Sequence, residues 1–148
     1  MHSRHVLVSC LVVLLAAAAC AGKPAALPGQ AHTAPPTPMP GKGSVIGVVA
    51  NAKETWPDMN VLYIFAAPFS GDANGKGIYF LDPSVHPHAA LEASGSFQLA
   101  NLTPQRYVLV VGPRADTSLP LLDDQGKTRI IEVRAGELLQ LGQVKVGQ

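Results

Sequence analysis

The amino-acid sequence predicts an all-β protein whose folded part is a single β-sandwich of about seven strands within residues 44–148. Short runs of β-branched and aromatic residues recur in this region, and turn-forming residues separate them. No long stretch has apolar residues at helical spacing between capping residues. The segment from Ser44 to about Val146 has about 103 residues, which is the usual size for one hydrophobic core.

The chain begins with a short basic segment, followed by an apolar run of 14 residues from Val6 to Ala19. A membrane-spanning helix needs roughly 20 apolar residues, so this run is short for a span. Basic residues followed by a short apolar run are typical of a secretory signal peptide. We therefore predict that residues 1–19 are a signal peptide.

The end of this run, residues 15–20 (Leu-Ala-Ala-Ala-Ala-Cys), resembles a bacterial lipobox, in which small residues precede a cysteine that receives lipid. That motif prefers Leu three residues before the cysteine, and Ala17 stands there instead. Residues 7–10 fit the motif by letter, but almost no hydrophobic region precedes Cys10. The resemblance implies lipidation at Cys20; the alternative is an ordinary signal peptide cleaved before it.

Lipidation at Cys20 would place a diacylglyceryl group, usually with a further acyl chain such as palmitate, at the start of the mature protein. Two or more acyl chains hold a protein stably on a bilayer, at about 0.8 kcal/mol per buried CH₂. The resemblance thus implies a protein anchored to a membrane of the bacterial cell envelope and facing the periplasm or the cell exterior. Ala21, which is not Asp, would permit outer-membrane sorting in a Gram-negative envelope.

Residues 20–43 comprise the predicted lipidated N-terminus and a proline-rich linker. Its prolines are Pro24, Pro28, Pro35, Pro36, Pro38 and Pro40. Such a composition cannot bury a core and favours polyproline II. At ~3.1 Å per residue the linker could reach roughly 70 Å, which suits a stalk between a membrane and a domain. Recognition of residues 35–38 by a partner is the alternative.

Cysteine content and charge exclude several function classes. Once Cys10 leaves with the signal peptide and Cys20 takes lipid, the mature chain has no thiol for a disulfide or a cysteine metal site. Without residues 1–19 the chain carries ten basic and ten acidic side chains. This balance predicts no nucleic-acid partner, because phosphate binding needs a basic face.

Seven segments have the alternation or the β-branched composition of strands. They are residues 44–50, 59–66, 78–81, 95–100, 106–112, 128–134 and 138–146. In the last segment Leu139 and Leu141 are odd-numbered, whereas Val144 and Val146 are even-numbered. Because Gly142 lies between the two phases, we predict a β-bulge there.

The inward-facing positions of these strands form the predicted core. It comprises Val45, Val49, Val61, Tyr63, Phe65, Phe97, Leu99, Leu102, Tyr107, Leu109, Val111, Ile131, Val133, Leu139 and Leu141.

Residues 94–111 are the most informative stretch. Ser94 and Gly95 form a turn, the next residues alternate as a strand, and Pro104 marks a corner because it cannot donate to a ladder. The pattern Gly-Ser-Phe-x-Leu-x-Asn-Leu-x-Pro-x-x-Tyr-x-Leu-x-Val resembles the carboxypeptidase regulatory-like, or transthyretin-like, β-sandwich domain of bacterial surface proteins. In that family Gly usually follows the corner proline, where this chain has Gln105.

The resemblance implies a carbohydrate-binding-like sandwich fold and brings no peptidase activity, because it does not include the catalytic zinc domain. A fibronectin type III domain is the second interpretation, since it shares the Leu-x-Pro…Tyr corner. That family has a core Trp in an early strand, whereas Trp56 precedes Pro57 outside any strand pattern.

Asp82, His86 and His88 are the candidate metal ligands. In an extended segment the two histidines would project to one side, and two imidazoles with a carboxylate are part of a zinc or copper site. The alternative, which we favour, is a pair of solvated loop histidines, because a selective site needs further ligands.

Two acidic segments are predicted to be turns. Residues 72–77 lack the ligands of an EF-hand at the required positions. Residues 123–127 have the Asp and Gly that turns select. Gly-x-Ser-x-Gly and His-Glu-x-x-His motifs are both missing from the sequence, so we predict no enzyme activity and no cofactor.

Trp56 and Phe69 are candidates for an aromatic platform that binds sugar rings; packing against the core or an edge is the alternative. The sequence therefore favours a non-enzymatic, membrane-tethered envelope lipoprotein whose sandwich is a structural or protein-interaction module. The second hypothesis is a carbohydrate-binding module of the cell envelope. The expected partners are the membrane and an envelope protein or polysaccharide.

Overall fold

The computed structural model describes residues 35, 37–72 and 74–147. The predicted signal peptide, the predicted lipidation site Cys20 and most of the linker lie outside these residues. The described chain forms the strands β1 (Gly43–Val49), β2 (Tyr63–Gly71), β3 (Gly77–Tyr79), β4 (His88–Ala90), β5 (Ser96–Leu102), β6 (Gln105–Gly112), β7 (Leu119–Leu122), β8 (Ile130–Val133) and β9 (Leu138–Val146). A helix, α1 (Ala52–Thr55), and two 3-10 segments, η1 (Met59–Val61) and η2 (Ala115–Thr117), lie between strands.

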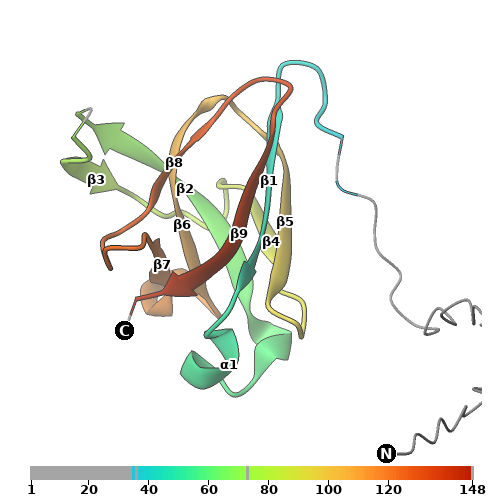
Figure 1. Ribbon diagram of the computed structural model, residues 1–148, viewed down its shortest axis with the longest axis vertical. Helices are drawn as coiled ribbons and strands as arrows, with labels where there is room; N and C mark the ends of the chain where they lie inside the picture. The colour runs from blue at the N-terminus through green and yellow to red at the C-terminus, as the bar shows by residue number, and fades with distance from the viewer. Residues whose placement is uncertain (1–34, 36, 73, 148) are drawn as a thin grey trace, which may run out of the picture. The chain divides into compact units, whose positions relative to one another are not determined.

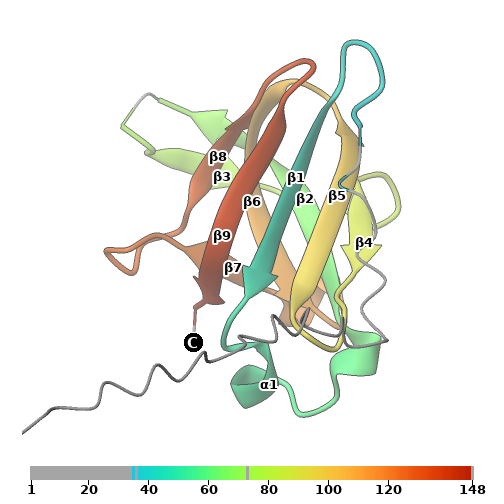
Figure 2. The ribbon, with the colours of Figure 1, turned by 45° about the vertical axis from the view of Figure 1, so that its right-hand side comes forward.

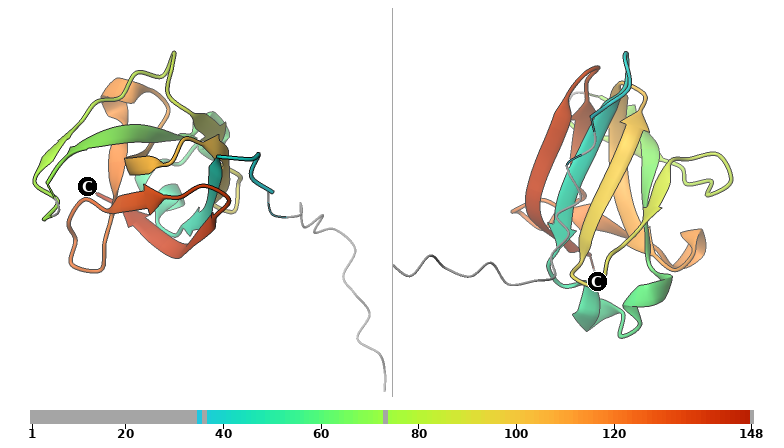
Figure 3. Two further views of the ribbon diagram at one scale, coloured as in Figure 1. Left: turned by 90° about the horizontal axis from the view of Figure 1, so that it is seen from above. Right: turned by 90° about the vertical axis from the view of Figure 1, so that its right-hand side faces the viewer.

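The strands form one hydrogen-bonded sheet with the main order β3-β2-β6-β7-β9-β1-β5, while β4 pairs with β2 and β8 pairs with β6. The sheet curls around its core, so that β5, β1 and β9 face β2 and β6 (Figures 1 and 2). Seen from above, the strands form an incomplete ring (Figure 3). The predicted all-β, sandwich-like fold is therefore confirmed.

The described residues contain more strands than the seven predicted. The prediction does not include β4 and β7. β4 has only three residues, His-Ala-Ala, and β7 has four, one of which is Pro120. The predicted strand 59–66 begins too early, since its first residues form η1 and β2 starts at Tyr63. These short segments depend on pairing with distant strands, and their local sequence alone does not specify them.

Most of the predicted core is buried. The confirmed residues are Val45, Val49, Phe65, Phe97, Leu99, Leu102, Tyr107, Leu109, Val111, Ile131, Val133 and Leu141. Leu139 is half-buried and packs against this core. The prediction is wrong for Val61 and Tyr63, because their exposed fractions are 47% and 39%.

The error at β2 arises because this strand is apolar on both faces. Leu62, just before the strand, and Ile64 and Ala66 within it pack into the main core. Phe65 belongs to a second cluster on the opposite face, with Val108 and Val110 of β6. A strand buried on both faces gives a continuous apolar run, so alternation cannot say which face is the main core.

The predicted bulge at Gly142 is confirmed. In the parallel pair of β1 and β9, Ile46 lies opposite Gln140 while Val48 lies opposite Gln143, so β9 has one extra residue between them. Gly142 has φ +66°, a conformation that glycine adopts at little cost. The bulge returns Val144 and Val146 to the core side.

The corner between β5 and β6 holds the last residues of the predicted linker. The Tyr107 hydroxyl donates to the Thr103 carbonyl at 2.9 Å, as in the tyrosine corner of many sandwiches. Asn101 has φ +58°, which Asn tolerates better than most residues. Its Oδ1 accepts the Met39 N–H at 3.0 Å, and Lys42 Nζ donates to Thr103 Oγ1 at 3.0 Å.

Candidate interaction site

The two aromatic residues predicted as a sugar platform lie apart. Trp56 follows α1 and packs, half-buried, against the main core. Phe69 lies near the C-terminal end of β2. The Arg106 guanidinium lies over its ring, 5.0 Å from the ring centroid. Arg106 also donates to the carbonyls of Gly71 and Asp72, so it fixes the β2–β3 hairpin across the sheet. The rings of Trp56 and Phe69 therefore each pack against other residues, and they do not lie together.

The predicted metal ligands also take separate partners. The Asp82 carboxylate accepts the hydroxyl of Ser84 at 2.6 Å and its N–H at 2.9 Å. These hydrogen bonds, with the nearby His86, lower the pKa of Asp82 below its ordinary value. His86 Nδ1 accepts the Asp82 N–H at 3.0 Å, whereas the His88 ring packs against Phe65 with centroids 5.5 Å apart. The described residues contain no cluster of three His, Cys, Asp or Glu side chains suited to a metal.

The two predicted turns are confirmed and have the same structure. In the first, Asp72 Oδ1 accepts the N–H groups of Asn74 and Lys76, each at 2.9 Å. In the second, Asp123 Oδ1 accepts the N–H groups of Gln125 and Lys127 at the same distance. Each turn therefore uses its Asp side chain to hold its own backbone.

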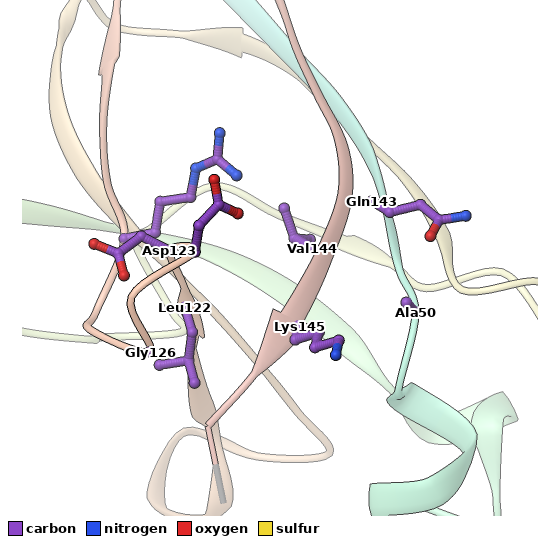
Figure 4. A pocket seen from close by; sticks show the side chains of 9 residues that line it. Ala50, Leu122, Asp123, Gly126, Gln143, Val144 and Lys145 are labelled. Atoms are coloured by element: carbon purple, nitrogen blue, oxygen red, sulfur yellow. The ribbon is translucent and has the colours of Figure 1, made fainter.

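A hollow of about 480 Å³ lies between the second turn and β9 (Figure 4). Its wall includes Asp123, Gln143 and Lys145. In the close view the side chains of Gln143 and Lys145 extend away from Asp123. Because Gln143 and Lys145 do not converge with Asp123 on one point, these groups lack the arrangement expected of a specific small-molecule site.

A smaller hollow of about 340 Å³ has an aromatic wall. We call it the aromatic hollow; its lining is Tyr63, Phe65, Pro83, His88, Pro113, Arg114 and Ala115. The Tyr63 ring lies 6.2 Å from Phe65 and 6.0 Å from His88, measured between centroids. Sites for small ligands typically combine such apolar walls with a few polar groups, here the imidazole and the guanidinium.

Sequence reasoning missed the aromatic hollow because strand pairing assembles it. Phe65 lies directly opposite His88 in the β2–β4 pair, although 23 positions separate them in the chain. The residues of β4 carry too little strand signal to predict this pairing. The alternation of Tyr63 and Phe65 is the available signal, but alternation alone predicts both residues to be core.

The most exposed apolar side chains lie at and just beyond β3. We call Ile78 and Phe80 the edge patch; their exposed fractions are 76% and 72%. β3 pairs only with β2 and ends the strand order, and it projects from the body of the sheet (Figure 1). An edge strand with exposed apolar side chains can pair with a strand of another chain.

A scan against protein-family models gives no match for this chain, and a search of curated proteins finds no similar sequence. In the described part of the chain, no helix has the length and hydropathy to span a membrane.

Proposed function

We propose that this chain is a non-enzymatic lipoprotein of the bacterial cell envelope, tethered through lipidated Cys20, whose β-sandwich binds another protein. The edge patch is the observation that carries the interaction role. Two large apolar side chains, Ile78 and Phe80, are each at least 70% exposed at or directly after the edge strand β3, where a protein in water gains by covering them. The tether is supported by the apolar run that ends at Cys20 and by the proline-rich segment after it.

The linker suits this arrangement, because its last residues are fixed to the corner between β5 and β6. Met39 and Lys42 are bonded to Asn101 and Thr103, so the chain leaves the sandwich at a defined place. Figure 1 places the edge patch strand β3 on the far side of the sheet from β1 and β5. The described end of this segment therefore contacts the corner between β5 and β6, and β3 lies elsewhere on the sheet.

The tether predicts that Cys20→Ser abolishes incorporation of labelled palmitate into the full-length chain, because Cys20 is the cysteine that follows the whole apolar run, whereas almost no hydrophobic region precedes Cys10. Cys10→Ser is the matched control, and it should label as strongly as the unmodified chain. Labelling is measured on the immunoprecipitated protein after growth with the labelled fatty acid. Undiminished labelling of Cys20→Ser, or no labelling of any form, would contradict the tether.

The aromatic hollow favours a second function, a carbohydrate-binding module of the envelope. Aromatic rings offer flat apolar faces to sugar rings, and His88 and Arg114 supply polar groups at the same hollow.

For this second function we expect Tyr63→Ala to weaken binding of envelope glycan fragments at least tenfold, because it removes an exposed wall of the hollow. Val61→Ala, at a residue that is also exposed but does not line the hollow, should leave binding unchanged. Calorimetric titration measures both. Equal affinities for the two variants, or no binding by the unmodified chain, would dismiss the carbohydrate function.

A further inference from the structure

The free edge of β3 has a defined set of backbone groups. Asp72 N–H donates to the Lys76 carbonyl at 3.0 Å, which makes these two residues a hydrogen-bonded pair. Hydrogen-bonded and non-hydrogen-bonded pairs alternate along antiparallel strands. Gly77 and Tyr79, which lie opposite Gly71 and Phe69, are therefore non-hydrogen-bonded positions. Their N–H and C=O groups point away from β2, toward an additional strand.

We propose that this edge pairs with the same edge of a second copy, as antiparallel strands related by a twofold axis at Ile78. The inference rests on the proposed interaction role and names its partner. In this register Gly77 lies opposite Tyr79 of the second copy, and the reverse, so each such pair joins residues whose backbone groups are free. Ile78 lies opposite its own counterpart, which covers the most exposed apolar side chain of the edge patch.

The charged side chains near this edge are compatible with the proposed register. Lys76 would lie opposite Phe80 of the second copy, and Asp82 follows Phe80 by two residues, beyond the end of β3. Such diagonal neighbours are within reach of a long side chain. Twofold symmetry gives the contact between Lys76 and Asp82 twice.

The side chains agree in shape on the opposite face. Tyr79 would lie across from Gly77, and an aromatic ring next to a glycine on a neighbouring strand is a recurrent stabilising pair. A Cβ on Gly77 would collide with the Ser70 carbonyl oxygen, so the hairpin itself requires a glycine at this position.

The proposed interface is small, because β3 has three residues. Stable interfaces bury about 1,600 Å², so we expect weak pairing in dilute solution. Tethering both copies to one membrane raises their effective concentration without any new contact. A covalent trap is therefore the appropriate measurement.

The test is disulfide trapping in the full-length chain carrying Cys10→Ser and Cys20→Ser, so that an introduced cysteine is the only thiol. Ile78→Cys would place two Cα atoms about 4.5 Å apart across the axis, within the range that a disulfide spans. Val85→Cys, which is 70% exposed but outside β3, is the control. With an added mild oxidant, we expect at least tenfold more linked homodimer from Ile78→Cys.

No homodimer, equal yields from the two variants, or a link from Ile78→Cys to a different protein would overturn the proposal. This background lacks Cys20, so its outcome is independent of the palmitate experiment, and either hypothesis can fail alone.

Charge reversal tests the register. Lys76→Glu in the Ile78→Cys chain should lower the yield of trapped dimer roughly three- to tenfold. A single exposed ion pair contributes little, but the twofold axis forms the pair of Lys76 and Asp82 twice. Lys127→Glu is the matched control, since Lys127 holds the same position in the second turn. Equal yields for these two variants would contradict the proposed pairing.

Discussion

Gly95→Ala is expected to lower the free energy of unfolding by about 3 kcal/mol or more, the combined cost of a left-handed backbone and a backbone collision. Gly95 has φ +85°, and a Cβ there would lie 2.5 Å from the Val49 carbonyl oxygen. The same residue closes the turn before β5, because its N–H donates to the Glu92 carbonyl at 2.8 Å. Its carbonyl accepts the Val49 N–H at 2.9 Å, so the two backbones cannot move apart freely.

Gly136→Ala separates these two costs. Gly136 has φ +75°, but a Cβ there would meet nothing within 4 Å. This variant should lose only the conformational part, about 1–2 kcal/mol. Urea denaturation of both variants and the unmodified chain gives the comparison. Equal losses would mean that contact with Val49 adds nothing to the requirement for glycine at position 95.

The turn at Gly95 and the bulge at Gly142 were both predictable, because each leaves a local mark in the sequence. Gly95 follows Ser94 directly before an alternating strand, and the change of phase in β9 occurs at Gly142. Short-range sequence chemistry determines such features, since turn type and strand period depend on adjacent residues.

The candidate sites were only partly predictable, because distant residues form them. The aromatic hollow requires β4 to lie beside β2, which places His88 opposite Phe65. Phe69 is packed because Arg106, on β6, reaches over its ring. Neither contact leaves a mark in the sequence near the residues involved. The segment containing Ile78 was recognised as a strand, but its position at the sheet edge follows from the whole topology.

In β2, too, the local sequence does not show which face packs into the main core. The variant Ile64→Ala tests the face that the structure assigns to it. Ile64 is fully buried between Val111 of β6 and Ala89 of β4. Truncating it should lower the free energy of unfolding by about 2–5 kcal/mol, through lost burial and the cavity left behind. Ile78→Ala removes the same atoms from a side chain that is 76% exposed, so it should change stability by about 0.5 kcal/mol or less.

The variant Val61→Ala then tests which face of residues 61–66 packs into the main core. If residues 61, 63 and 65 formed the main core, as alternation alone predicts, Val61→Ala would be costly and Ile64→Ala mild. The structure requires the reverse, because Val61 lies in η1 with 47% of its surface exposed. A shift of one residue exchanges the faces of a strand, so the two alternatives differ by several kcal/mol at each position and one denaturation series separates them.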